Sequence, residues 1–157
     1  MTTNAEEYNI FDDLVDLPIG KKIIKIEMSE DYLLIHFEGN DPLILGVEAD
    51  CCSMSYFHDF IGAENVIGKK LISIDSVYLN GATTQFKPPN DDINNSVVKV
   101  YGYQIVATND IYGELRAVFS FRNASNGYYG GELRLADRPL TDEETAKLIN
   151  ITSNFTF

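Results

Sequence analysis

Apolar and polar positions alternate, or form short apolar runs, in three successive segments near the start of the chain, residues 22–28, 32–38 and 42–48. Ser-Glu-Asp and Gly-Asn-Asp turns separate these segments. Spacing of this kind predicts a β-meander of three strands. The same patterning predicts further strands at residues 71–79, 97–108, 112–121 and 128–135.

Two segments instead have a helical period. Tyr56, Phe57, Phe60 and Ile61 predict a helix over residues 53–62, which a serine would cap and Gly62 would end. A capping box that starts at Thr141 predicts a second helix through about residue 150. Residues 1–19 are acidic and are expected to form a loose arm, or a short helix over 6–16. The prediction is therefore a single α+β domain over residues 20–157. It would have an antiparallel sheet of about six to seven strands, with one or two short helices packed on it.

The composition of the chain argues against some classes of function. The net charge of the 157 residues is −12, which argues against a DNA-binding protein because nucleic-acid binding needs a basic surface. No apolar run approaches the ~18 residues that a membrane span needs, and the polar, acidic start does not resemble a signal peptide. We therefore expect no membrane partner and a cytoplasmic location. Adjacent Cys51 and Cys52 fit the reducing conditions there.

The segment Asp50-Cys51-Cys52-Ser53, with His58 nearby, is the best candidate for metal binding or nucleophilic catalysis. Adjacent side chains point apart, whereas zinc ligands come in spaced pairs. One histidine several residues away is weak support for a catalytic cysteine. The favoured interpretation is structural, with small thiols buried under the predicted helix. No catalytic residue, metal ligand or cofactor is therefore predicted.

The richest segment for ligand binding is Arg122-Asn-Ala-Ser-Asn-Gly-Tyr-Tyr-Gly-Gly131. It follows the apolar run 118–121, which is predicted to be a buried strand, so the segment is expected to form a turn and the start of the next strand. A guanidinium binds phosphate in bidentate fashion, although Arg122 could equally bond the carbonyls of the turn. All four arginines of the chain lie in its last 42 residues, whereas the first 50 residues hold 12 of its 24 acids. Charge for an anionic ligand is therefore expected in the last third. The candidate ligand-binding residues here are Arg122, Asn123, Ser125, Asn126 and Tyr128.

Three aromatic residues complete the candidate set. Phe86 is the aromatic residue of a long polar loop, 80–96, and could pack back on the domain or stack on a base. Tyr101 and Tyr103 flank Gly102 and share one face of a predicted strand. A glycine within a strand often marks a bulge or the close approach of a ligand.

Several of these segments together resemble a family of small phage proteins, the Thoeris anti-defence sponges. The resemblance covers about residues 20–135. It rests on Asp50-Cys-Cys-Ser-x-Ser, on Gly62-Ala63 with Ile67-Gly68, on Tyr101-Gly-Tyr103 and on the Arg122–Gly131 segment. Three features differ from the family: Ala124 replaces a usual serine, the turn over residues 108–114 is longer, and both ends of the chain are extended.

The resemblance implies a binding protein that is not an enzyme. Such proteins act in the host bacterial cytoplasm, where they sequester cyclic ADP-ribose isomers without cleaving them and so silence a host immune effector. Some also hold cyclic oligonucleotides, and they assemble as homodimers or larger homo-oligomers. The resemblance also implies that Arg122 and Asn123 contact the phosphates or ribose of the ligand. The alternative is an enzyme that degrades such a messenger with Cys51 or Cys52 and His58. A protein–protein inhibitor with an acidic, DNA-like surface is a third possibility.

Overall fold

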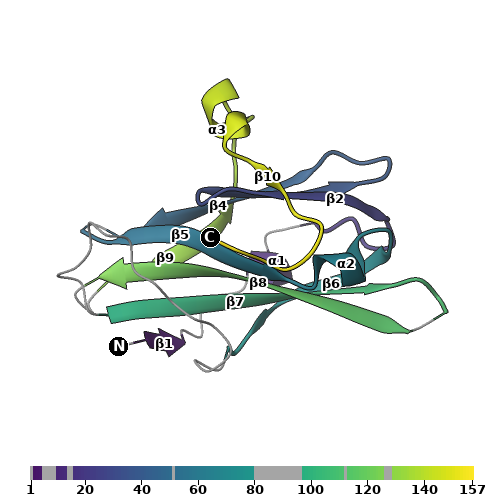
Figure 1. Ribbon diagram of the computed structural model, residues 1–157, viewed down its shortest axis with the longest axis horizontal. Helices are drawn as coiled ribbons and strands as arrows, with labels where there is room; N and C mark the ends of the chain where they lie inside the picture. The colour runs from purple at the N-terminus through teal and green to yellow at the C-terminus, as the bar shows by residue number, and fades with distance from the viewer. Residues whose placement is uncertain are drawn as a thin grey trace.

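A computed structural model shows the chain as two β-sheets packed face to face (Figure 1). It describes residues 2–4, 10–13, 16–50, 52–79, 97–111, 113–125 and 129–157. Sheet A, as we name it, has six strands in the order β1-β7-β8-β5-β11, with β6 also paired to β7. Sheet B has five strands in the order β10-β2-β3-β4-β9. All pairings are antiparallel except that of β1 with β7, which is parallel.

The strands have the following bounds. Sheet A consists of β1 (Thr2–Asn4), β5 (Met54–Ile61), β6 (Lys70–Val77), β7 (Val97–Thr108), β8 (Glu114–Ser125) and β11 (Phe155–Thr156). Sheet B consists of β2 (Ile23–Met28), β3 (Tyr32–Phe37), β4 (Leu43–Ala49), β9 (Gly131–Leu135) and β10 (Ile149–Asn150).

The expected meander is confirmed as β2-β3-β4, and the strand predicted at 97–108 is β7. The helix expected over 53–62 is wrong, because most of this segment is strand β5. A β-bulge between Phe57 and Asp59 explains the misleading period. The extra residue puts Phe57 and Phe60 on the same, inward face, so a strand acquires the three-residue spacing of a helix.

The expectation for residues 122–125 is also corrected. They do not form a turn but continue β8 to Ser125, paired to β7 on one side and to β5 on the other. Their polar character hid the strand, since a run of buried polar residues does not show the usual alternation. The consequence for the site is that Arg122 and Asn123 occupy opposite faces of sheet A.

Helices are few and short among the described residues: α1 (Ile10–Asp13), α2 (Ala63–Val66) and α3 (Asp142–Ala146). The capping box at Thr141 is confirmed, but α3 ends well before residue 150. The expected antiparallel sheet structure with short helices is confirmed, but the α+β class with six to seven strands is corrected to a β-sandwich, because the additional strands complete a second sheet. None of the helices described is long and apolar enough to cross a bilayer.

The main core lies between the sheets. It joins Leu33, Ile35 and Leu45 of sheet B with aromatic side chains of sheet A. Phe60, Phe119, Tyr103, Phe121 and Tyr101 form a ladder of nearly parallel rings across β5, β8 and β7, with successive centroids 6.0, 5.4, 6.3 and 4.4 Å apart. Cross-strand aromatic contacts of this kind add to the stability that burial provides.

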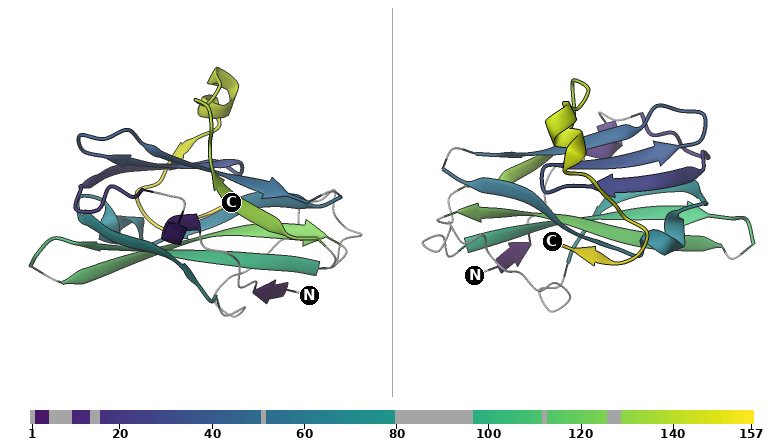
Figure 2. Two further views of the ribbon diagram at one scale, coloured as in Figure 1. Left: turned by 180° about the vertical axis from the view of Figure 1, so that it is seen from behind. Right: turned by 45° about the horizontal axis from the view of Figure 1, so that its top comes forward.

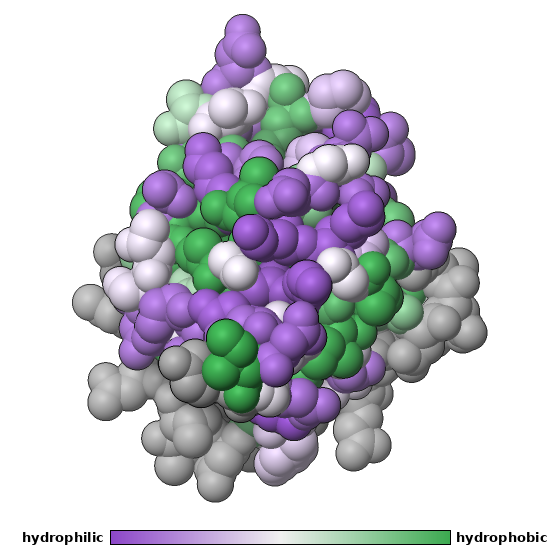
Figure 3. Space-filling model, turned by 90° about the vertical axis from the view of Figure 1, so that its right-hand side faces the viewer, coloured by the Kyte–Doolittle hydropathy of each residue, from purple (hydrophilic) through white to green (hydrophobic). Residues whose placement is uncertain are grey.

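The two ends of the sandwich differ. The end that carries the β7–β8 hairpin faces the viewer in Figure 3, where small apolar patches lie among polar residues. The other end holds the last residues of β8 and the first of β9. That second end brings the sequence motifs together.

Candidate functional site

Three motif segments meet at the second end of the sandwich. The side-chain amide of Asn123 donates to Ser53 Oγ and Ser55 Oγ, both at 3.0 Å. Asp50 and Gly130 exchange two bonds of 3.1 Å: the Gly130 N–H donates to Asp50 Oδ2, and the Asp50 N–H donates to the Gly130 carbonyl. The structure thus ties the Asp50–Ser55 segment to both halves of the Arg122–Gly131 segment.

The Tyr101-Gly-Tyr103 segment joins the same cluster. The Gly131 N–H donates to Tyr101 Oη at 3.1 Å, and Gly102 lies under the side chain of Leu79, which leaves no room for a Cβ atom. Gly102 is therefore required by packing on the outer face of sheet A, while the two tyrosines point inward.

Gly130 and Gly131 are also required by close approach. A Cβ on Gly130 would lie 2.9 Å from Tyr101 Oη, and one on Gly131 would collide with Ser55 Oγ and lie 3.1 Å from Phe121 Cε2. Such distances are too short for a side chain unless the neighbours move. The glycine pair lets the start of β9 pass directly over the aromatic ladder.

A cavity of about 290 Å³ opens beside this glycine pair. The rings of Tyr101, Tyr103 and Phe121 form its aromatic wall, and the first residues of β9 and Asp50 form the rest. Tyr101 and Phe121 are stacked, with centroids 4.4 Å apart and planes 4° from parallel. The hydrogen bond from Gly131 and this stacking hold Tyr101 in a fixed orientation.

Charges of both signs border the cavity. Asp50 and Glu132 are among its lining residues. Lys99 reaches the same rim, because its Nζ lies 3.8 Å from the position of a Cβ on Gly130. Lys99 is paired with Asn123 across β7 and β8 and so shares the inner face. One cation beside two carboxylates can hold a ligand that has both hydroxyl or amine donors and a negative group.

Asn123 offers a further polar atom at this end of the sandwich. Its side chain is fully buried, and its Oδ1 has no hydrogen-bond partner among the described residues. Buried acceptors are normally satisfied. Asn123 Oδ1 is therefore a buried acceptor that no described residue satisfies.

Arg122 lies on the other face of sheet A, away from the cavity. It is 0% exposed, and its Nη1 donates to Ser120 Oγ at 3.1 Å. Ser120 in turn donates to Asp59 Oδ1. Burial lowers the pKa of the Arg122 guanidinium, although Asp59 and Tyr56 act in the opposite direction. Arg122 is thus part of a buried chain of polar groups on the outer face.

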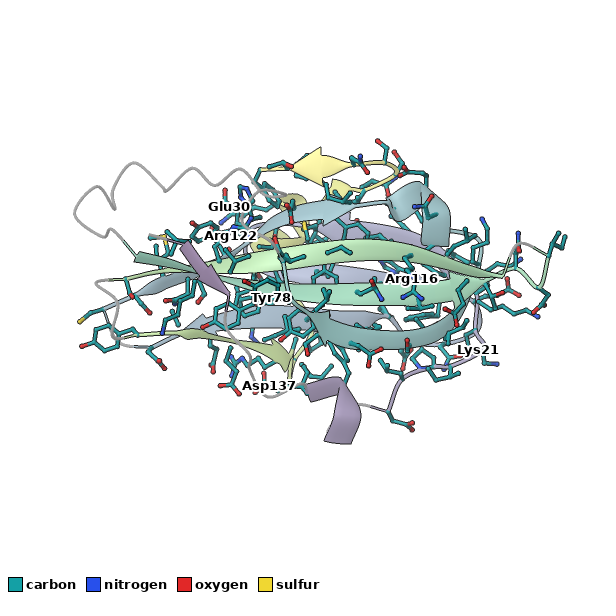
Figure 4. All side chains as sticks on the ribbon, turned by 90° about the horizontal axis from the view of Figure 1, so that it is seen from below. Lys21, Glu30, Tyr78, Arg116, Arg122 and Asp137 are labelled. Carbon is teal, nitrogen blue, oxygen red and sulfur yellow. The ribbon has the colours of Figure 1, made fainter. Side chains whose placement is uncertain are left out.

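The four arginines are dispersed, which corrects the expectation of a cationic region. Figure 4 shows Arg122 and Arg116 toward opposite ends of the same sheet. The other three are ion-paired: Arg116 with Glu114 at 2.8 Å, Arg134 with Glu48 at 2.6 Å, and Arg138 with Glu144 at 2.8 Å. A guanidinium cluster for phosphate does not form within the described part of the chain.

The Arg138–Glu144 pair borders a smaller cavity of about 190 Å³ on the outside of sheet B. Both Nη atoms of Arg138 donate to the carboxylate, which holds the pKa of Glu144 well below its usual range. The hydrogen bond with Glu144 raises the pKa of Tyr32. These contacts fasten α3 to the sheet, since α3 has no buried residue of its own.

The cysteine prediction is corrected. Cys52 is exposed, at a positive φ of 66°, in the link between two strands, so no helix buries it. His58 is buried within β5, and the extended strand separates Met54 from His58 by about 13 Å. A nucleophile and its base need to lie about 3 Å apart, so this geometry does not favour their cooperation. Cys51 lies outside the described residues. Where the structure describes the chain, histidine, cysteine and acidic side chains form no group of three that could hold a metal ion.

Of the eight predicted site residues, the structure brings Tyr101 and Tyr103 into the cavity and Asn123 and Ser125 to the same end of the inner face. Ser125 Oγ donates to the Tyr129 carbonyl at 3.4 Å. Phe86, Asn126 and Tyr128 lie outside the described residues. Phe121, Glu132 and Leu133 of the lining, and Lys99 at the rim, are not among the predicted residues. Lys99 and Phe121 could have been found from their shared face with Tyr101, whereas Glu132 gave no signal.

Comparison with known proteins assigns the chain to a protein family. A family model described as Domain of unknown function (DUF7448) matches residues 16–135. Uncharacterized protein L278 of Acanthamoeba polyphaga mimivirus is 32% identical over 128 residues, which cover 76% of this chain and 90% of that protein. No solved structure matches the chain. The β-sandwich with its glycine-lined cavity thus belongs to the family of the DUF7448 domain.

Proposed function

We propose that this protein binds and sequesters a cyclic nucleotide-type messenger, of the class of the cyclic ADP-ribose isomers, without cleaving it. The observation that supports the proposal most is the convergence of the motif segments. Residues 50–55, 101–103 and 122–131 are far apart in sequence, yet their hydrogen bonds and glycine contacts build one aromatic-walled cavity. These are the segments whose resemblance to the anti-defence sponges suggested a ligand.

The chemistry of the cavity suits a nucleoside. A flat base can pack against the tyrosine wall, while the Asp50 carboxylate can accept hydrogen bonds from ribose hydroxyls or an exocyclic amine. At about 290 Å³ the cavity is at the small end of ligand sites. In this proposal it encloses one nucleoside part, and the phosphates lie outside it at Lys99.

The placement of Arg122 changes the role expected for it. Its side chain faces away from the cavity, so in the proposal it stabilises the end of β8 and does not contact the ligand. The mimivirus relative supports a viral setting for the protein. Sequestration in that setting needs tight binding and no chemical step on the ligand.

Native mass spectrometry and calorimetry with a panel of cyclic ADP-ribose isomers, cyclic oligonucleotides and linear ADP-ribose test the proposal. We expect one ring-containing ligand per cavity and the same unaltered ligand after denaturation of the complex. Lys99→Gln should weaken binding by about tenfold to a hundredfold, since one charged hydrogen bond contributes about 1.5–3 kcal/mol. Lys25→Gln, an exposed lysine of sheet B, is the matched control and should leave affinity unchanged.

Other outcomes would decide against the proposal. Recovery of a cleaved ligand would support the enzyme alternative that uses Cys51 or Cys52 with His58. Absence of binding to every member of the panel would remove the proposed ligand class. If binding were lost equally in the Lys99 and Lys25 variants, the cavity would not be the site.

A further inference from the structure

The C-terminal segment of the chain pairs with an edge strand in each of the two sheets. β10 is antiparallel to β2, with Ile149 opposite Met28, and β11 is antiparallel to β5, with Phe155 opposite Phe60. Two further backbone bonds extend these short pairings: Ile151 N–H to the Ile26 carbonyl at 2.8 Å, and Phe157 N–H to the His58 carbonyl at 2.9 Å. Residues 149–157 therefore cross the open flank between β2 and β5 (Figure 2).

Side chains anchor this segment locally. Ile151 is 1% exposed and belongs to the main core. Asn154 Oδ1 accepts the Gly62 N–H at 2.8 Å. Phe155 packs against the core and meets the edge of Phe157, with ring centroids 4.8 Å apart. All the anchoring groups thus lie within residues 151–157.

The connection to this segment is long, and Arg138 and Glu144 bond it to Tyr32 of sheet B. Residues 136–148 join β9 at one edge of sheet B to β10 at the other. Four strand spacings separate these edges, about 19 Å, whereas thirteen residues can reach about 45 Å. The connection is mostly exposed, and α3 projects from the body of the molecule (Figure 1).

We propose that the flank between β2 and β5 is a strand-binding surface, and that the C-terminal segment of a second copy of this chain can fill it. The edges of β2 and β5 bind the backbone of residues 149–157, and the surrounding residues bind the side chains of Ile151 and Asn154. These contacts are the same whichever copy of the chain supplies the segment. An exposed connection with excess reach allows exchange of this segment between two copies. Addition of a strand to a sheet edge is a common mode of peptide recognition. The cavity lining contains no residue of β2 or of this segment, so the exchange is independent of the proposed ligand binding.

Shortening the connection tests the proposal. Deletion of residues 138–147 leaves at most about 15 Å between Leu135 and Ile149, too short for a chain to fill its own flank. We expect this variant to be a folded dimer or a closed larger ring by size-exclusion chromatography with light scattering. The matched control replaces residues 138–147 with ten Gly and Ser residues, which restores the reach, and should be monomeric at the same concentration. A monomeric or unfolded deletion variant beside a folded control overturns the proposal.

A second measurement uses the full chain with a protease site inserted after Glu143. After cleavage, a fluorescent peptide of residues 147–157 in excess should replace the resident segment, followed by anisotropy. A peptide with Ile151→Asp and Asn154→Ala should bind at least tenfold more weakly, whereas one with Ser153→Ala, an exposed residue, should bind within twofold. Equal affinity for all three peptides, or no exchange, overturns the proposal. A failure here leaves ligand binding at the cavity unaffected, so the two proposals fail separately.

Discussion

Replacement of Gly131 by alanine tests whether the glycines of the motif serve close packing. Gly131 opens β9 and lies against Ser55, Phe121 and the Glu48 carbonyl. An added Cβ would overlap Ser55 Oγ and stand 3.1 Å from Phe121 Cε2 and 3.2 Å from the Glu48 oxygen. Ser55 must rotate to make room, and it then loses the hydrogen bond that Asn123 Nδ2 donates to it.

The expected cost follows from these contacts. Overpacking of a filled site costs about 1–3 kcal/mol, and a hydrogen bond lost from a buried amide costs about 1 kcal/mol more. Alanine restricts the unfolded chain and returns about 0.4–1 kcal/mol. Gly131→Ala should therefore lower the free energy of unfolding by about 1–4 kcal/mol. Gly46→Ala is the matched control, because its Cβ would only touch the Tyr32 ring at 3.4 Å.

Urea denaturation of a double-mutant cycle isolates the cause. Ser55→Ala removes the overlapping hydroxyl, so Gly131→Ala should cost at least about 1 kcal/mol less in that background than in the original chain. If the two substitutions are additive within about 0.5 kcal/mol, the overlap with Ser55 is not what requires glycine. If Gly131→Ala costs no more than Gly46→Ala, the close-packing argument as a whole is refuted.

Three further predictions concern groups outside the cavity. Arg122→Met should lower the unfolding free energy by about 3–5 kcal/mol, because a buried ionic network loses one partner; thermal denaturation measures this, and a change below about 1 kcal/mol would contradict it. Glu144→Gln should destabilise the protein at neutral pH, and progressively less as the pH falls below about 4.3. The reason is that the lowered pKa of Glu144 stabilises the folded state only while the carboxylate is ionised. Urea titrations from pH 3 to 7 measure this, and a difference in unfolding free energy between variant and original chain that did not change with pH would mean that the Arg138 pair is unimportant. Ile151→Ala should lower the unfolding free energy by about 2–5 kcal/mol in the same urea titrations at pH 7. Ser153→Ala should lower it by less than about 0.5 kcal/mol. Equal values for the two variants would mean that the C-terminal segment is not anchored in the core.

The meander strands of sheet B, β2 to β4, could be predicted because each keeps the period of its structure. In β2 and β3 the apolar side chains face one core, and polar turns separate them. β5 could not be recognised, because the bulge at His58 shifts one face by a residue and imitates a helix. A bulge is specified by pairing with β8, a partner more than fifty residues away in sequence. Local patterns carry no information on such a partner.

The site was predicted in part for a similar reason. Tyr101 and Tyr103 could be assigned to one face from alternation alone, and they line the same cavity. The polar run from Arg122 to Ser125 predicts a turn, and a turn does not show which side chains share a face of the sheet. Once β8 is known to continue, alternation puts Phe121 and Asn123 inside and Arg122 outside. The error in the secondary structure thus caused the error in the site.

Residues outside the family match contribute to the core. The matched residues, 16–135, include every strand that lines the cavity. Yet Phe11 and Ile151 are buried in the main core from outside that range. Phe11 meets the edge of Tyr103 at 5.8 Å between centroids, beside the cavity, whereas Ile151 lies on the β2 side, where its N–H reaches Ile26. The two terminal segments therefore seal opposite sides of one sandwich, and only the N-terminal segment touches a side chain of the cavity. If the C-terminal segment exchanges as proposed, it can change the number of copies in an assembly without contacting the proposed ligand site, whereas a shift of α1 would act directly on Tyr103.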